Sequence, residues 1–510
     1  APIFTAGPIP KKRYSLFAGQ WVGMSGIALK EENRMARKDE EYLIQKDLYA
    51  RLQRGQIDRR QFLTRMMATG LGIAGVSAAL AGCAAPAAPS AAPASSGGAA
   101  PAAAAPVAER PLTPTFYQWI EDLHPSIPTV NAQFPGLNYQ IAPVEGFGIE
   151  RFVAEAKNNE STWDVYVGMT PFVEMTALIE AGVIEPWDDY IPQDVLDDII
   201  PSIREECTVD GKLYSWPFLL DVIGMGWNSE MTEKAGIATI PSTWPEYLEA
   251  SKLIQSSGAA LYGCTFDSHG WRSLVPYTHS MSPDVYTAEG LFDFTSEPAI
   301  AGLKLMKEMM ALSHPDILLE GATDGGVNGT PDEVAFAARK VAYYTKYFNA
   351  PLRMAANWPD PSKLMMGGLP KFENGSGSTV FWTTGSCLFK NGKNKEKAAE
   401  YIKSLTYDMQ IWQDSIAGTA VAHPGQLPPY QSIYAGWEAS RPDWLPDFVG
   451  LITGQLPKAR AITNHAFGLS QFQIAKPEWE KYLNGTEPDP MVAMQGAWDV
   501  VQAEIAKTKA

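Results

Sequence analysis

The sequence predicts an α/β fold of two lobes, each a doubly wound, mainly parallel sheet covered by helices. From residue 112 onward, strand-like runs alternate with helical runs, an order typical of parallel sheets. One β-like run, Leu213–Asn228, is long enough to cross from one lobe to the other. Hydrophobic residues make up 45% of the 510 and charged residues 19%. A large core is therefore available, and global disorder is excluded.

The expected elements follow in order along the body. Residues 112–120 and 139–144 are strand-like runs, and 149–159 carries Phe152 and Ala156 on one helical face. Further strands are expected at 164–169, 340–348 and 380–389, and further helices at 172–181, 244–257, 298–312, 395–413 and 490–507.

Two kinds of signal mark helix ends. Gly182 follows 172–181 at the C′ position, where the left-handed backbone favours glycine. Thr243-Trp-Pro-Glu246 is a capping box, because the threonine and glutamate side chains can satisfy free backbone N–H groups at a helix start. Thr330-Pro-Asp-Glu333 has the same pattern, with proline at its favoured first position.

The segment before the body has the order of an export signal. Residues 1–82 carry a net charge of +6, and the remainder carries −22. The motif Arg59-Arg-Gln-Phe-Leu63, which contains Arg60 and Phe62, precedes an uncharged stretch that is shorter than a bilayer span of roughly 20 residues. Leu80-Ala-Gly-Cys83 then places small residues before a cysteine that can take a diacylglyceryl group. The motifs resemble a twin-arginine signal and a bacterial lipobox. We expect twin-arginine export and a lipid anchor at Cys83 on the extracytoplasmic face of the membrane.

The rest of the chain divides by composition. Residues 1–58 form an N-terminal extension, and because Met35 is a credible start we expect residues 1–34 to have no role in the mature protein. The Ala/Pro/Ser/Gly-rich stretch 84–110 cannot form a core and is expected to be a tether. The body is expected to comprise 111–221 as the first part of lobe 1, 222–350 as the first part of lobe 2, and 351–510 as returning segments that complete both lobes.

Several functional classes are disfavoured. A net charge of −16 argues against nucleic-acid binding, which needs basic surface. No C-x-x-C pair and no Cys/His cluster is present, so we expect no metal site. The chain has no nucleophile or phosphate-loop motif, so neither an enzyme nor a cofactor is expected. The acid pairs Glu121/Asp122 and Asp188/Asp189 are typical of solvated surface rather than of acid–base catalysis.

A family resemblance rests on the run from Met225-Gly-Trp-Asn-Ser-Glu230 to Ala235-Gly-Ile237, followed by Pro241-Ser-Thr-Trp-Pro-Glu246. These residues resemble a characteristic stretch of family 1 extracellular solute-binding proteins. Proteins of that family are the capture components of ABC importers and are similar to maltose-binding protein. Further matches are Trp163-Asp-Val-Tyr-Val-Gly168, Glu180-Ala-Gly-Val-Ile-Glu-Pro186, Lys393-Asn-Lys-Glu-Lys-Ala-Ala399 and Phe336-Ala-Ala-Arg-Lys-Val-Ala342, the last with Arg339 where glycine is usual. The resemblance extends from Leu112 to the end of the chain.

The resemblance implies a type II periplasmic-binding-protein fold that holds a solute between lobes joined by hinge strands. It implies a small solute and ABC permease subunits as partners, and we expect a monomer. The first crossing is expected at Asp221–Gly224. The ligand-binding residues that the resemblance implies are Trp119, Glu121, Asp122, Thr170, Asp221, His269, Trp271, Tyr347 and Trp382.

The residue types in this set favour a carbohydrate. Aromatic rings stack on sugar C–H faces, and carboxylates accept hydrogen bonds from hydroxyl groups. With Asp267 as a further candidate carboxylate and Arg272 and Lys346 as the close basic neighbours, an anionic solute is disfavoured. A cationic solute such as a polyamine remains an alternative, and core packing is the alternative role for each aromatic residue.

Other readings stay open at the level of sequence. A surface-anchored carbohydrate-acting enzyme and a sensor lipoprotein with the same binding fold both fit the export signal. Cys207, Cys264 and Cys387 remain after lipidation, and either one disulfide or three buried thiols agrees with the sequence.

Overall fold

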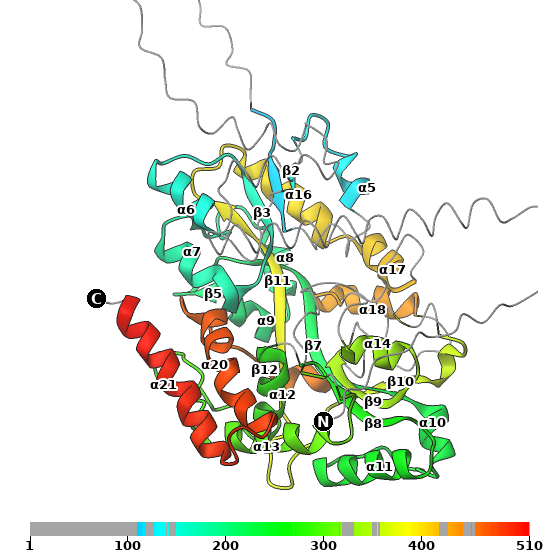
Figure 1. Ribbon diagram of the computed structural model, residues 1–510. Helices are drawn as coiled ribbons and strands as arrows, with labels where there is room; N and C mark the ends of the chain where they lie inside the picture. The colour runs from blue at the N-terminus through cyan, green and yellow to red at the C-terminus, as the bar shows by residue number, and fades with distance from the viewer. Residues whose placement is uncertain are drawn as a thin grey trace, which may run out of the picture. The chain divides into compact units, whose positions relative to one another are not determined.

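The computed structural model describes most of the chain after residue 109 (Figure 1). The described residues are 110–117, 127–138, 140–141, 149–268, 270–315, 317–318, 331–348, 354, 358–417, 427–441, 450 and 454–508. All of them belong to one compact unit, Pro106–Ala510. Within these ranges none of the helices combines the length and the hydropathy needed to span a bilayer.

A mixed sheet of ten strands organises this unit. Its main path runs β2 (Gln140–Ile141), β1 (Pro114–Phe116), β3 (Val165–Met169), β11 (Thr379–Phe389), β7 (Trp216–Asn228), β9 (Val341–Tyr347) and β8 (Tyr262–Phe266). Three short strands join the path: β10 (Leu364–Gly367) pairs with β7, and β4 (Ile184–Glu185) and β12 (Ala459–Ala461) pair with β11. β5 (Thr208–Val209) and β6 (Lys212–Leu213) form a separate hairpin.

The sheet is parallel at its ends and antiparallel in the middle. β1 pairs in parallel with β2 and β3, and β8 pairs in parallel with β9. Such pairs need long crossover connections, which here carry helices. The long strands β7 and β11 run antiparallel to each other and to β9 and β3 respectively. They form the ribbon that joins the two parallel parts (Figure 1).

β7 passes from one part of the sheet to the other at a defined point. Its residues 216–222 pair with β11, and its residues 223–227 pair with β9. The change of partner lies between Val222 and Ile223, inside the segment where the sequence predicts the first crossing. Gly224 allows a close approach there, because a Cβ at this position would lie 2.1 Å from Cε1 of Phe348.

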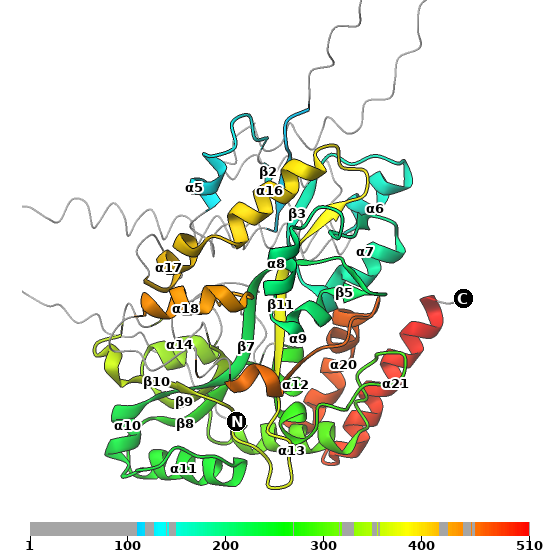
Figure 2. The same ribbon diagram turned by 180° about the vertical axis from the view of Figure 1, so that it is seen from behind.

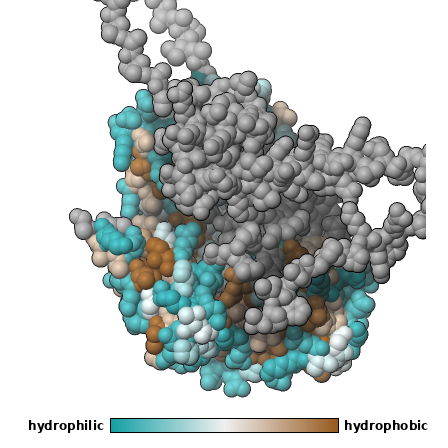
Figure 3. All heavy atoms as spheres, in the orientation of Figure 1, coloured by the Kyte–Doolittle hydropathy of each residue, from teal (hydrophilic) through white to brown (hydrophobic). Residues whose placement is uncertain are grey.

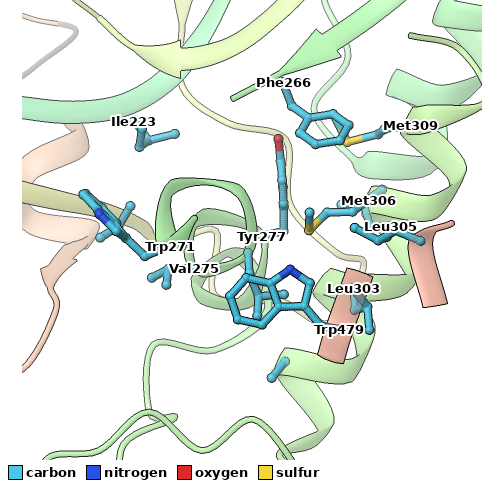
Figure 4. Close-up of a cluster of buried hydrophobic side chains, with 14 of the residues drawn as sticks. Ile223, Phe266, Trp271, Val275, Tyr277, Leu303, Leu305, Met306, Met309 and Trp479 are labelled. Carbon is cyan, nitrogen blue, oxygen red and sulfur yellow. The ribbon is translucent and has the colours of Figure 1, made fainter. Parts of the chain in front are cut away.

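The hydrophobic cores change at the same point. Leu220 and Val222 belong to a core that includes Trp187, Trp216, Trp412 and Trp437. Ile223 and Met225 belong to a second core, which includes Phe266, Met309 and Trp479 (Figure 4). Adjacent residues of one strand thus serve different cores, as expected for a strand that joins two lobes.

Helices cover the sheet. In chain order they are α5 (Ile127–Asn131), α6 (Glu150–Lys157), the π-helix η3 (Pro171–Met175), α7 (Thr176–Glu180), α8 (Gln193–Asp198), α9 (Pro201–Glu206), α10 (Ser229–Lys234), α11 (Trp244–Ser256), α12 (Trp271–Met281), α13 (Glu297–Met310), α14 (Pro331–Ala337), η4 (Pro361–Lys363), α16 (Lys395–Thr406), α17 (Met409–Ala417), α18 (Gln431–Ala439), η5 (Leu456–Lys458), α20 (Gly468–Leu483) and α21 (Pro490–Thr508). Figure 2 shows the same helices from behind.

Most of the predicted helix ends are confirmed. The capping box at Thr243 and Glu246 is present, and Gly182 has the left-handed φ of +66°. Thr330 of the second predicted box lies outside the described residues. The single helix predicted at 395–413 is wrong, because the chain forms α16 and α17 instead. Asp408 causes the break, since its carboxylate accepts hydrogen bonds from the backbone N–H groups of Gln410 and Ile411 and so starts a new helix.

Two long helices were not predicted. α12 contains Pro276 and α20 contains Pro477. Proline inside a helix removes a backbone donor and usually predicts a helix end. Tertiary packing overrides that signal here, because α12 packs on α13 and α20 packs on α21.

The described surface is mainly polar in the view of Figure 3, with hydrophobic residues in small groups. Among the described large hydrophobic residues, the exposed ones are Leu253, Leu261, Val334, Met491 and Val492. Isolated residues of this kind are normal on a folded protein.

Candidate ligand-binding site

The structure describes part of the predicted site. Side chains are described for Thr170, Asp221, Trp271 and Trp382, and the backbone is described for Tyr347. Trp119, Glu121, Asp122 and His269 lie outside the described residues, as do Cys83 and the export motif of Arg59, Arg60, Phe62 and Leu63.

Asp221 and Trp382 face each other across the two crossing strands. They are register partners in the β7–β11 pair, so both lie within two residues of the point where β7 changes partners. The side chain of Asp221 is half-buried, and Trp382 is 6% exposed. A carboxylate and an aromatic ring are therefore adjacent on the strands that join the two lobes.

Trp271 contacts this pair, and Thr170 is connected to it along the chain through Phe172. The Trp271 ring contacts Trp382 edge to face, with 4.6 Å between ring centroids, and Phe172 at 4.8 Å. Phe172 belongs to η3, and Thr170 is the N-cap residue of that helix. The backbone carbonyl of Thr170 accepts hydrogen bonds from the N–H groups of Val173 and Glu174. The structure thus joins three of the predicted residues into one cluster and connects Thr170 to it through Phe172.

The two tryptophans are also core residues. Trp271 is 7% exposed, and both rings belong to the second core, where Figure 4 shows Trp271 beside Val275 and on the side of Ile223. Edge-to-face pairs of this kind contribute about 0.5–1.5 kcal/mol beyond burial. Core packing therefore accounts for most of the surface of each side chain.

Next to Trp271 lies a buried ion cluster at the carboxyl ends of β8 and β9. The Nζ atom of Lys346 lies 2.9 Å from Asp267, 3.0 Å from Asp332 and 3.4 Å from Glu333. Nε of Arg272 lies 3.3 Å from the same Asp267 oxygen. The carboxyl ends of parallel strands are where α/β proteins bind ligands. Both predicted basic neighbours are ion-paired, and the acids of the cluster outnumber its cations.

Asp332 and Glu333 were not predicted as part of this region. They lie in the first turn of α14, which precedes β9 directly. The available signal was the short connection between the end of α14 and the start of β9. Because the chain turns back there, the start of α14 lies close to Lys346 near the end of β9. Tyr344 also contributes, since its hydroxyl donates to Asp332 at 2.8 Å.

Two other acids are buried without a cation among their described partners. Glu174 accepts a hydrogen bond from the Tyr166 hydroxyl at 3.4 Å, and burial raises its pKa to about 8. Glu206 accepts hydrogen bonds from the N–H and hydroxyl groups of Thr383, and burial raises its pKa to about 8. Burial disfavours the charged form and so favours the protonated form of both acids.

The remaining candidates have structural roles. The three cysteines after residue 109 are free and buried, which decides between the two alternatives left by the sequence. Asp188 accepts a hydrogen bond from the N–H of Leu213 in β6 at 2.9 Å and so helps to position that strand. In the part of the chain that the structure describes, no group of three or more His, Cys, Asp or Glu side chains is placed to hold a metal ion.

Comparisons with known proteins agree with this architecture. The fold is similar to the GacH receptor of Streptomyces glaucescens, solved unliganded and with acarbose (18% identity, 77% of this chain and 97% of that chain, TM-score 0.61). It is similar to maltose-bound MalE3 of T. maritima (15% identity, 77% and 98%, TM-score 0.62) and to an Agrobacterium vitis solute-binding protein with D-mannitol (18% identity, 78% and 98%, TM-score 0.59).

The curated relatives found by sequence match a smaller part of this chain than the solved structures do. A binding protein of Brucella abortus is 24% identical over 232 residues, which are 44% of this chain and 54% of that protein. The match therefore spans about half the length of this curated relative. A maltotriose-binding protein of Pyrococcus abyssi is 30% identical over 84 residues, 16% of this chain and 17% of that protein. Residues 111–409 match the family described as bacterial extracellular solute-binding protein. The chain belongs to the bacterial extracellular solute-binding protein family.

Proposed function

We propose that this protein captures a sugar or oligosaccharide between its two lobes and delivers it to the permease of an ABC importer. The observation that carries the proposal is the Asp221–Trp382 pair, which lies on both crossing strands where β7 changes partners. A solute that contacts this pair would touch the strands on which the angle between the lobes depends.

The chemistry of the cluster supports a neutral polyhydroxy solute. The rings of Trp271 and Trp382 can contact the C–H face of a sugar ring, and Asp221 can accept hydrogen bonds from hydroxyl groups. The nearby cations Lys346 and Arg272 are ion-paired and offer little to an anionic group. Among the structural relatives, MalE3 holds maltose and the Agrobacterium vitis protein holds D-mannitol, both uncharged polyols.

Binding energy is sufficient to drive closure of the lobes. A ligand that contacts both lobes binds the closed form more tightly and shifts the population toward it. A micromolar ligand supplies about −8 kcal/mol, and a shift from 1:99 to 99:1 needs about 5.5 kcal/mol of differential affinity. Closure is therefore feasible if most of the contacts form only in the closed state.

We also infer that the protein works as a lipid-anchored receptor outside the cytoplasm. This part rests on the twin-arginine motif and on the lipobox that ends at Cys83. Cys83→Ser should release the protein from the membrane fraction, and Arg59→Lys combined with Arg60→Lys should block export. A Cys83→Ser protein that stays in the membrane after a salt wash would contradict the anchor.

A ligand panel tests the binding function. The Cys83→Ser protein is heated with maltose, maltotriose, D-mannitol, spermidine or glucose 6-phosphate, and hits are titrated by calorimetry. Because binding to the native state alone raises the melting temperature, a neutral sugar or polyol should raise it while the charged compounds do not. A response to spermidine or to the phosphate alone overturns the solute class, and sugar turnover in the same samples would indicate an enzyme.

A further inference from the structure

One edge of β11 changes strand partner where the strand passes between the two lobes. β11 pairs with β7 along one edge, over residues 381–386. Along the other edge it pairs with β12 through residues 379–381 and with β3 through residues 385–388. Between these two pairs, Thr383 and Thr384 are paired on that edge with none of the strands that the structure describes. Register shifts in both neighbouring pairs begin at residues 384–386, so the strand is irregular where the gap ends.

The Glu206 carboxyl occupies this gap. Its Oε1 accepts the backbone N–H of Thr383 at 3.1 Å, and its Oε2 accepts the Thr383 hydroxyl at 2.7 Å. Glu206 is 5% exposed and Thr383 is fully buried. A side chain thus satisfies the backbone donor that a neighbouring strand would satisfy elsewhere, in a place where an unpaired N–H would be costly.

The same residue reaches a third segment. The backbone carbonyl of Glu206 accepts a hydrogen bond from Nδ2 of Asn464 at 2.7 Å, shortly after β12 ends. On the other side, Ile203 and Cys207 fix the end of α9 in the first core. Figures 1 and 2 both show α9 beside β11, and α9 contacts both β11 and β12.

We propose that Glu206 is the positioning residue of the hinge: it ties α9 of one lobe to β11 and to the Asn464 segment where the chain passes between lobes. The bond from Asn464 and the two bonds from Thr383 fix how β11 leaves β3 and meets β12. The resting angle between the lobes, and through it the affinity for a solute that both lobes contact, depends on this carboxyl. The proposal does not depend on which solute is bound.

No cation lies among the described partners of the Glu206 carboxyl. Thr383 from β11 and Asn464 after β12 do not ionise, and the titratable side chain beside it is the Cys207 thiol, which lies 3.6 Å from the Thr383 hydroxyl. Burial raises the pKa of Glu206 to about 8 and, together with Glu206, also raises the pKa of Cys207. Loss of the proton above pH 8 would place an uncompensated charge inside the hinge.

Distances between the lobes in the ligand-free protein test the proposal. The exposed residues Lys157 of α6 and Lys252 of α11 are replaced by cysteine in the Cys83→Ser full-length chain and carry spin labels. Pulsed electron–electron double resonance then measures the distance between the two labels. Glu206→Gln keeps the size of the side chain and cannot ionise: its amide oxygen can accept from the Thr383 N–H, and its NH2 group can donate to the Thr383 hydroxyl in place of the bond that the carboxyl accepts. Glu206→Leu removes both bonds. Glu174→Gln is the matched control, because Glu174 is similarly buried but belongs to η3, and its carboxyl accepts from Tyr166 instead of from Thr383.

The expected pattern separates a hinge role from a general loss of packing. Glu206→Leu should shift or broaden the distance distribution at pH 7, whereas Glu206→Gln and Glu174→Gln should keep it. Between pH 7 and pH 9 the original protein and Glu174→Gln should change, and Glu206→Gln should not. If Glu206→Leu does not fold, the pH series of Glu206→Gln decides alone. An unchanged distribution in Glu206→Leu, or the same pH response with and without Glu206, overturns the proposal and leaves the sugar-binding function untouched.

Discussion

The molecule buries acids in two different ways on either side of the candidate site. At the carboxyl ends of β8 and β9, Asp267, Asp332 and Glu333 surround Lys346, so charge compensates charge. Beside β11, Glu206 meets the uncharged Thr383, and burial raises its pKa to about 8. In the first group cations compensate the buried carboxylates, whereas Glu206 has no cation among its described partners. Burial therefore favours the protonated form of Glu206.

The candidate aromatics connect these two regions. Trp271 is followed by Arg272, which is ion-paired with Asp267, and Trp382 is followed by Thr383, which donates to Glu206. The two rings contact each other at 4.6 Å between centroids. A solute bound beside them would therefore lie between a cluster of paired charges and a buried acid whose pKa is raised.

The largest expected effect comes from removing the cation of the ion cluster. Lys346→Met leaves the surrounding carboxylates buried without their central partner, and such a change costs about 3–5 kcal/mol. Lys363→Met is the control, because Lys363 pairs with Glu233 at the surface and its loss should cost less than about 1 kcal/mol. Urea unfolding at pH 7 measures both. Equal costs would mean that the cluster is not a compensated set of ions.

The next effect concerns the two rings between the regions. Trp271→Ala and Trp382→Ala should each weaken sugar binding by about 1–3 kcal/mol, measured by calorimetry. Both rings are buried, so both variants should also lose stability. Trp244→Ala is the control: Trp244 is buried in the same core and donates to Ser280 at 2.9 Å, so stability should fall while the affinity stays. An equal loss of affinity in all three variants would mean that Trp271 and Trp382 act only through core packing.

A smaller effect follows from pH. Raised pKa values for Glu174 and Glu206 mean that the folded state holds their protons more tightly than the unfolded state, so their contribution is complete below pH 4.5 and is lost as the pH rises through about 8. His279 acts in the opposite direction, because burial lowers its pKa from 6.5 to about 4 and its contribution is lost as the pH falls through that value.

The window between pH 6.5 and 8 therefore isolates the two acids. The free energy of unfolding should fall there by up to about 1.4 kcal/mol per pH unit for each proton. Glu206→Gln and Glu174→Gln should each remove about half of that slope, as measured by denaturant unfolding across the window. A slope that neither substitution changes would show that these acids are ionised in the folded protein.

Local signals in the sequence were sufficient for several features. The capping box at Thr243 and the C′ glycine Gly182 depend on neighbouring residues only, and the Leu213–Asn228 run is long enough to cross between lobes. Features that depend on tertiary packing were not available. The sequence does not indicate that Asp332 meets Lys346, or that Glu206 fills a gap beside Thr383, because each contact joins separate elements.

Solution scattering on the protein with and without its sugar tests the central claim, that a solute at Asp221 and Trp382 draws the lobes together. A saturating sugar from the ligand panel should reduce the radius of gyration. Asp221→Ala should reduce both the affinity and that change, because Asp221 is the register partner of Trp382 beside the point where β7 changes partners. A saturating ligand that leaves the scattering profile of the unsubstituted protein unchanged would contradict closure of the lobes.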